Sequence, residues 1–270
     1  MYLNNNIAHI VKKDNNHKLT LKYRIASVNI EINCLYGYSF LDFRKYISNF
    51  TEPDIRVDVT QEDIDEERLM RTDIPEPIVM VDDERVAVTY DFGCLEPQVA
   101  MKKTAEAIIS YDTFLFHGAV IEKDGYAYMF TAPSGVGKTT RIRLWLDNYP
   151  DSVIVNGDKP FIKITGEKAI ACGSPWCGKE GWNNNIMVPL RAIFLLDRAE
   201  SDEENSVTEI SIGKAFPFLL KQAYCPKDPD AMRKTIWLLR SLEGKVKFYR
   251  FHSAPTHEAV KLAFETARPR

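Results

Sequence analysis

Residues 130–145 read FTAPSGVGKTTRIRLW, and this stretch decides the fold of the C-terminal part of the chain. Two glycines, a lysine and hydroxyl side chains in the order GxGKT are typical of a loop whose backbone N–H groups bind phosphate. The usual pattern has a further glycine where this chain has Ala132. That first position serves mainly the turn that leaves the strand, so we expect the alanine to remove some backbone freedom but no phosphate ligand.

The residues around this loop predict a strand before it and a helix after it. Two apolar runs flank Asp124-Gly125, which is typical of a β-hairpin turn, and the second run leads into the loop. Residues 139–149 read as a helix that ends at Pro150. A phosphate-binding loop requires this frame. We therefore predict that ATP binds to eight consecutive residues, namely Pro133, Ser134, Gly135, Val136, Gly137, Lys138, Thr139 and Thr140.

Each part of the predicted site has a chemical role. Backbone N–H groups of the loop and the positive end of the helix suit phosphate, and Lys138 supplies charge for the β- and γ-phosphates. The Thr139 hydroxyl suits Mg²⁺. Asp158 ends an apolar strand downstream, where it can bind Mg²⁺ or accept the proton of an attacking hydroxyl. An aspartate in an ordinary turn is the structural alternative.

Composition sets the class of protein. The chain has 270 residues, 45% of them hydrophobic and 27% charged, as in soluble globular proteins. A net charge of −3 gives no general attraction to nucleic acid or to an anionic membrane. No signal peptide or membrane-length apolar run is visible, and five scattered cysteines suggest a reduced, cytoplasmic setting. Cys172 and Cys177 lack a second ligand pair at zinc-site spacing, so ordinary buried thiols are expected.

The chain divides into two predicted regions. Residues 1–95 read as short strands with polar breaks, and we predict a β-rich region there that recognises a substrate or partner. Helical spacing begins near residue 98, so a boundary is placed near Cys94 and a catalytic domain in residues 96–270. Strands and helices alternate through that domain, which predicts an α/β (α+β) fold with a mixed sheet flanked by helices.

A family resemblance rests on two segments. HGAVIEKDGYAYMFTAPSGVGKTT at 117–140, followed by VIVNGDKP at 153–160, resembles the catalytic domain of HPr kinase/phosphorylase and its kinase-like relatives. ATP-dependent phosphoenolpyruvate carboxykinases share this core. The resemblance covers residues 113–200, and the last 70 residues only loosely. It implies a P-loop core of this type that uses ATP and Mg²⁺, and self-association, because such relatives often form oligomers.

The resemblance extends to individual positions. His117 falls where the family has an active-site histidine near the transferred phosphoryl group; a packed core histidine is the structural alternative. Asp158 matches the second residue of an acidic pair whose first position is Gly157 here. One carboxylate therefore stands where the family divides metal binding and proton abstraction between two. An ExRGxG-like segment is not reproduced, so the likeness does not extend to the reverse, phosphorylase reaction.

A polar segment between two later strands adds further candidates. Lys179 can neutralise charge on a transferring phosphoryl group, so we group it with His117, Lys138 and Asp158 as catalytic. Trp176 can stack on a flat substrate, and substrate contacts are also assigned to Asn184 and Arg191. A surface loop with an anchoring tryptophan, and an arginine paired with surface acids, are the structural alternatives.

Three functions remain open at this point. The first is a kinase that transfers the γ-phosphoryl group of ATP to a hydroxyl acceptor, either a serine of a protein or peptide or a small molecule. The second is a nucleotide-binding regulatory module without transfer, which Gly157 favours. The third, a lyase acting on oxaloacetate, needs more metal ligands and arginines than a chain with five histidines offers. No nucleic acid or membrane partner is expected.

Overall fold

A computed structural model of the chain describes residues 12–13, 19–37, 43–70, 78–81, 84–87, 92–199 and 205–269. The chain divides into two compact units, Met1–Ala107 and Ile108–Arg270. Helix α2 (Phe92–Ala107) thus belongs to the first unit, although the sequence pattern places its start near a boundary at Cys94. Apolar and polar residues alternate in residues 86–90, which predicts a strand; residues 86–87 belong to a short strand at Glu84–Ala87, and residues 88–90 lie outside the described residues.

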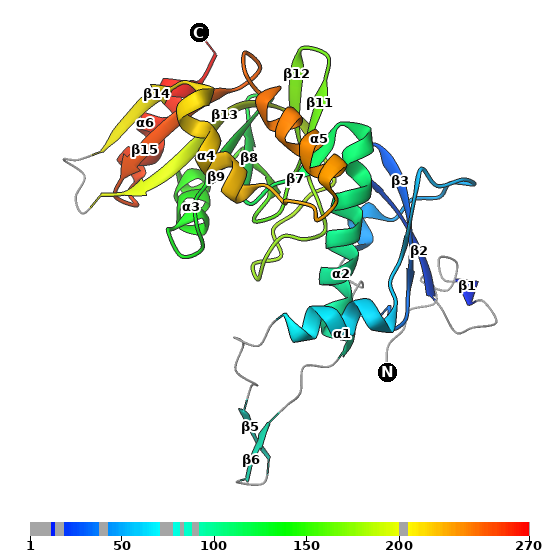
Figure 1. Ribbon diagram of the computed structural model, residues 1–270. Coiled ribbons are helices and arrows are strands. Elements are labelled where there is room, and N and C mark those ends of the chain that lie inside the picture. The colour runs from blue at the N-terminus through cyan, green and yellow to red at the C-terminus, as the bar shows by residue number, and fades with distance from the viewer. Residues whose placement is uncertain are drawn as a thin grey trace. The chain divides into compact units, whose positions relative to one another are not determined.

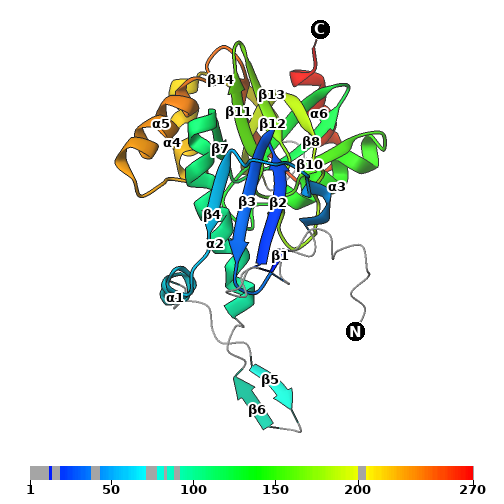
Figure 2. The same cartoon turned by 90° about the vertical axis from the view of Figure 1, so that its right-hand side faces the viewer.

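The first unit contains a small mixed sheet (Figure 2). Its strands follow the order β1 (Lys12–Lys13), β2 (Leu19–Ile25), β3 (Val28–Cys34) and β4 (Ile55–Asp58). Every second residue of β3 is buried, as expected for a strand with one face on a core. The described part of this unit also contains helix α1 (Gln61–Leu69) and the hairpin β5 (Ile78–Val81) with β6 (Glu84–Ala87).

Helix α1 forms in the charge-dense segment QEDIDEERL, whose composition is compatible with an exposed helix or a loop. Thr60 and Asp63 form a capping box, in which the Thr60 hydroxyl accepts from the Asp63 N–H and the Asp63 carboxylate accepts from the Thr60 N–H. The ammonium of Lys103, on α2, lies 2.5 Å from the same carboxylate. Helices α1 and α2 are therefore joined at the start of α1.

The second unit is built on one mixed sheet (Figure 1). Its main path runs β10-β8-β9-β13-β12-β11-β7, and β13 also pairs in parallel with β15, which pairs with β14. The strands are β7 (Thr113–Leu115), β8 (Ala119–Lys123), β9 (Tyr126–Thr131), β10 (Val153–Asn156), β11 (Phe161–Thr165), β12 (Lys168–Cys172), β13 (Met187–Arg198), β14 (Ser206–Ile210) and β15 (Lys247–Ser253). The predicted mixed α/β architecture is confirmed at this level.

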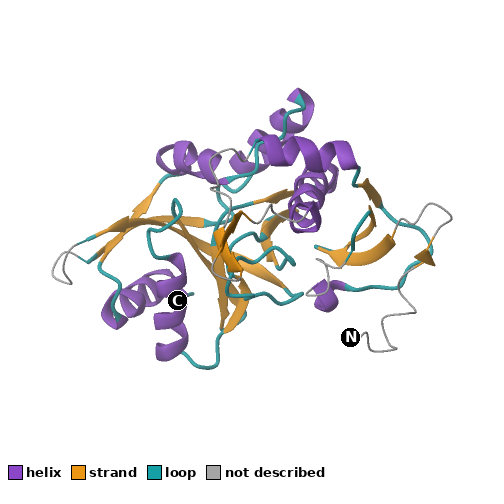
Figure 3. Ribbon diagram, turned by 90° about the horizontal axis from the view of Figure 1, so that it is seen from below, coloured by secondary structure: helices purple, strands orange, loops and turns teal. Residues whose placement is uncertain are grey.

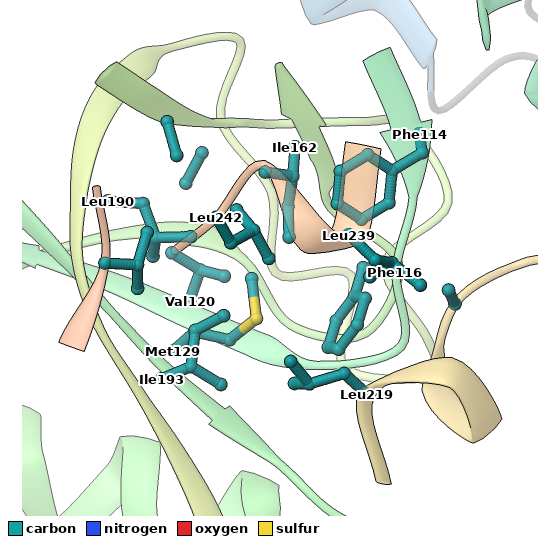
Figure 4. Packing of buried hydrophobic residues seen from close by; sticks show 14 of the residues in the cluster. Phe114, Phe116, Val120, Met129, Ile162, Leu190, Ile193, Leu219, Leu239 and Leu242 are labelled. Carbon is teal, nitrogen blue, oxygen red and sulfur yellow. The ribbon is translucent and has the colours of Figure 1, made fainter. Parts of the chain in front are cut away.

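Helices cover both faces of this sheet (Figure 3). Tyr128 and Phe130 of β9 point to one core, shared with α3 (Lys138–Asn148) and α6 (His257–Ala267). Met129 points to the other core, shared with α4 (Ile212–Gln222) and α5 (Pro229–Arg240), and Figure 4 shows it among Val120, Ile193 and Leu219. Because neighbouring residues of β9 face opposite cores, this strand is buried on both sides.

Strand directions bring three segments to one edge of the sheet. Strand β8 lies between β9 and β10 and is antiparallel to both. The end of β9, the end of β10 and the start of β8 therefore meet at the same edge, which we call the carboxyl edge. The glycine loop (residues 132–140) follows β9, and the acid turn (residues 156–159) closes β10. This edge holds the candidate site.

Among the described residues, no helix has both the length and the apolar character to span a membrane.

Candidate functional site

The glycine loop has the backbone form of a phosphate cradle. Gly135 and Gly137 have φ values of +85° and +103°, which L-residues with side chains rarely adopt. Helix α3 begins directly after Gly137, at Lys138. A Cβ atom built on Gly135 would meet no atom within 4 Å, and residues 133–135 are exposed. The loop is therefore open to a ligand in front of the N-terminus of a helix, where free N–H groups favour anions.

The surroundings of Ala132 show why this position of the loop accepts an alanine. Its side chain is fully buried in the core that β9 shares with α3 and α6. Its carbonyl accepts a hydrogen bond of 3.0 Å from the ammonium of Lys138. Its φ is not positive, so the position does not need glycine. The alanine thus contributes packing and holds Lys138 across the loop.

A histidine–aspartate pair next to the glycine loop joins the start of β8 to the turn after β10. His117 Nε2 lies 3.2 Å from Asp158 Oδ1, and its Nδ1 lies 2.8 Å from Oε1 of Gln222 at the end of α4. The His117 N–H donates to the Gln222 carbonyl, and the Thr131 hydroxyl donates to the His117 carbonyl, both at 2.8 Å. Asp158 and Gln222 therefore hold the imidazole, Gln222 and Thr131 hold the backbone of the same residue, and the ring faces a carboxylate rather than the core.

The acid turn is shaped by a residue that the sequence reading did not single out. Asn156 is fully buried, and its Oδ1 accepts from the backbone N–H groups of Asp158 (2.8 Å) and Lys159 (2.7 Å). Its Nδ2 donates to the Ser174 carbonyl at 2.9 Å. Asparagine followed by glycine and aspartate is a turn signal that could have pointed to it. This side chain fixes the direction in which Asp158 leaves the strand.

The charged groups of the site modify one another. Burial opposes ionisation of Asp158, but its hydrogen bond with His117 and the charges of Lys159, His117 and Lys138 outweigh it and lower the pKa of this carboxyl. Burial lowers the pKa of Lys138, against the opposing effect of Asp158. Burial lowers the pKa of Lys159 in the same way. A single carboxylate thus stands among partly desolvated cations.

Gly157 occupies a position where a side chain has little room. A Cβ atom there would lie 3.1 Å from the Cys177 carbonyl oxygen and 3.3 Å from Cβ of Trp182. The Gly157 N–H donates to the Trp182 carbonyl at 2.8 Å. The loop of residues 173–186 therefore lies directly against the acid turn and fills the space that an acidic side chain would need.

The loop of residues 173–186 also holds three of the predicted residues. Lys179 is exposed and follows Gly178, where an added Cβ would lie 3.3 Å from Cβ of Asp158. Trp176 is only 6% exposed and packs edge-on against Phe161, so its ring belongs to the core and offers no free face for stacking. Asn184 donates through Nδ2 to the Ile154 carbonyl at 2.9 Å and so supports β10.

Arg191 lies away from the other predicted residues. It is the extra residue where the pairing of β13 with β9 shifts, between the pairs Leu190–Ala127 and Ala192–Tyr128. These pairs lie near the start of β9, three to four residues and roughly 10–13 Å from its end at the carboxyl edge. Its Nε donates to the carbonyl of Ala267, at the end of α6. The Arg191 side chain thus stabilises the end of α6, and a substrate contact by this residue stays a prediction.

The residues present fit a nucleotide phosphate chain and Mg²⁺. Thr139 lies half-buried in the first turn of α3, and Asp158 lies at the neighbouring strand end of the same edge. Over the described ranges, no group of three or more His, Cys, Asp and Glu side chains gathers as a metal cluster. Mg²⁺ in phosphate-transfer sites needs none, because it is bound by one or two protein oxygens together with substrate phosphates and water.

Neither a protein-family model nor a curated protein sequence matches this chain. Among solved structures, the Hpr(Ser) kinase/phosphatase from Coxiella burnetii is similar over 56% of this chain and 95% of that chain. The identity is 11% and the TM-score is 0.33. This is a distant likeness, and no residue role is transferred from it.

Proposed function

We propose that the second unit is an ATP- and Mg²⁺-dependent kinase of the HPr-kinase-like group. Its substrate besides ATP is a hydroxyl compound, either a serine of a protein or peptide or a small molecule. The observation that carries this proposal is the meeting of the glycine loop and the Asp158–His117 pair at one edge of the sheet. A loop that only binds nucleotide needs no ionised carboxylate paired with a histidine beside it.

The residues divide the reaction among them. The glycine loop and Lys138 bind the phosphates, and Thr139 and Asp158 would hold Mg²⁺, which neutralises charge on the phosphates when bound. Asp158 accepts the proton of the acceptor hydroxyl while the hydroxyl oxygen forms its bond to the γ-phosphorus. The bond from that phosphorus to the β–γ bridging oxygen breaks, and ADP leaves. His117 orients the Asp158 carboxylate through the 3.2 Å contact.

Binding and transfer are tested in sequence. ATP titration by calorimetry with Mg²⁺ is expected to show binding that is lost in Lys138→Met and kept in Lys168→Met, a matched change at an exposed lysine of β12. Labelled ATP is then incubated with serine peptides and small alcohols. Absence of ATP binding by the unmodified protein would refute the proposal.

A second candidate function has one observation in its favour. The space next to Gly157 is filled by residues 177 and 182, so the turn holds a single acid. A nucleotide-binding regulatory module would need no second acid. Tight ATP binding with no transfer to any acceptor, unchanged in Asp158→Asn, would favour this module over the kinase.

A further inference from the structure

Lys159 is the cation of the acid turn that the kinase chemistry above does not use. Its backbone is held on both sides: its N–H donates to Asn156 Oδ1 at 2.7 Å, and its carbonyl accepts from the Ser174 hydroxyl at 2.5 Å. Neither atom can move without breaking a contact with a fully buried side chain, because Asn156 and Ser174 are both at 0% exposure. The starting point of the Lys159 side chain is therefore fixed next to Asp158.

The ammonium at the end of this side chain has no partner among the residues that the structure describes. Within the ranges that the structure describes, it makes no hydrogen bond and no ion pair. The residue is half-buried. Its Nζ has no hydrogen bond but is not completely buried, so solvent still reaches it. Partly desolvated charges are normally paired. An anion bound from outside the chain would be the missing partner of the Lys159 ammonium.

The charge balance of the site indicates what kind of anion fits. Lys138, Lys159 and the positive end of α3 stand against the single carboxylate of Asp158. The charge of Lys159 acts on Lys138 and on Asp158 alike, which places all three within electrostatic range. The surplus of positive charge suits a group with at least two negative charges. A terminal phosphoryl group has them, and a single hydroxyl or carboxylate does not.

We propose that Lys159 is a second phosphoryl-binding lysine, whose ammonium binds the terminal phosphoryl group of a nucleoside triphosphate. This inference rests on the proposed function, because it requires the triphosphate to lie in the glycine loop. The two lysines approach from different strands: Lys138 follows β9, and Lys159 follows β10, with β8 between them. Such a pair distinguishes ATP from ADP by the charge at the end of the chain.

The test compares the affinities of ATP, ADP and AMP, each with Mg²⁺, measured by calorimetry. Lys159→Met keeps the length of the side chain and removes its charge. We expect it to weaken ATP binding by about tenfold or more, the usual loss for a hydrogen bond between charged groups, and to leave ADP and AMP unchanged. Lys159→Arg is expected to restore part of the preference for ATP. The control, Lys168→Met, should bind all three nucleotides like the unmodified protein.

Three results distinguish a failure of this proposal from a failure of the proposed function or of folding. If the unmodified protein binds no ATP, the proposed function itself fails. If it binds ATP and Lys138→Met does not, but Lys159→Met keeps the original ratio of ATP to ADP affinity, only the role of Lys159 is overturned. Thermal unfolding without ligand adds a structural check. A lower Tm in Lys159→Met together with an equal loss of affinity for all three nucleotides would also overturn it.

Discussion

His117 Nε2 lies 3.2 Å from Asp158 Oδ1, and this contact joins the start of β8 to the turn after β10. The same two segments are joined through the backbone, where the Gly118 N–H donates to the Asp158 carbonyl at 2.9 Å. The other imidazole nitrogen contacts Gln222, 105 residues along the chain. The orientation of Asp158 therefore depends on groups from three separate parts of the sequence, and the predictions about the site start from this pair.

Asp158→Asn separates the two roles that the proposed function gives this residue, proton acceptor and Mg²⁺ ligand. A general base typically contributes a factor of about 100 to 10,000, so as a base its loss should lower kcat by that much at little cost in ATP affinity. As a metal ligand, its loss should instead raise the Mg²⁺ concentration needed for half-maximal rate. Initial rates at several Mg²⁺ concentrations check this, using ATP hydrolysis until the acceptor is known. Unchanged kcat and unchanged Mg²⁺ dependence would contradict both roles.

Asn156 is expected to be a positioning residue for Asp158. Asn156→Ala removes the acceptor of two backbone N–H groups and the donor to the Ser174 carbonyl, and buried groups left unpaired cost roughly 1–3 kcal/mol each. We expect a lower Tm and a lower kcat with the KM for ATP little changed. Asn156→Asp keeps the acceptor and loses the donor, so it should retain more activity than the alanine variant. Equal activity of both variants would show that the turn does not depend on this side chain.

Local features of the second unit were predictable from the sequence, because they depend on neighbouring residues. The turn at Asp124-Gly125 has φ values of +54° and +80°, as the residue pair indicates. Asp228 caps α5 by accepting from the Ala231 N–H, as its place before the helix suggests. Strand β14 gave no signal, because its residues are mostly exposed or half-buried and carry little apolar alternation.

The parts of the site that depend on distant pairing could not be predicted in the same way. The contact of His117 with Gln222 follows from the path of α4 past β7, which no local pattern encodes. The shift in pairing at Arg191, whose Nε donates to the Ala267 carbonyl, likewise depends on how β13 pairs with β9 and not on its neighbours in the sequence. Trp176 is a residue type that often binds ligands, and its sequence neighbours do not indicate that its ring packs against Phe161.

We predict that packing of the neighbouring loop is the reason why position 157 carries glycine and not a second acid. Gly157→Asp places a Cβ against a backbone oxygen, 3.1 Å away at Cys177, which cannot rotate aside as a flexible side chain can. We therefore expect a lower Tm and no gain in phosphoryl transfer. Gly157→Ala introduces the same Cβ without charge, so it should lose a similar amount of stability. If Gly157→Ala is as stable as the unmodified protein and Gly157→Asp is more active, the packing explanation is wrong.

The Asp63–Lys103 contact makes the stability of the first unit depend on pH. Burial alone would raise the pKa of Asp63, but hydrogen bonds from Lys103 and Thr60 outweigh it and lower the pKa in the folded protein. A carboxyl whose pKa is lower when folded stabilises the protein above its unfolded pKa, about 3.9 for aspartate. That stabilisation is lost as the pH falls through the folded value. Urea unfolding of the unmodified protein and of Asp63→Asn should therefore differ most near pH 6 and converge below pH ~4. Lys103→Met should shrink the difference at pH 6, and a difference that stays constant with pH would show that Asp63 acts only as an uncharged cap.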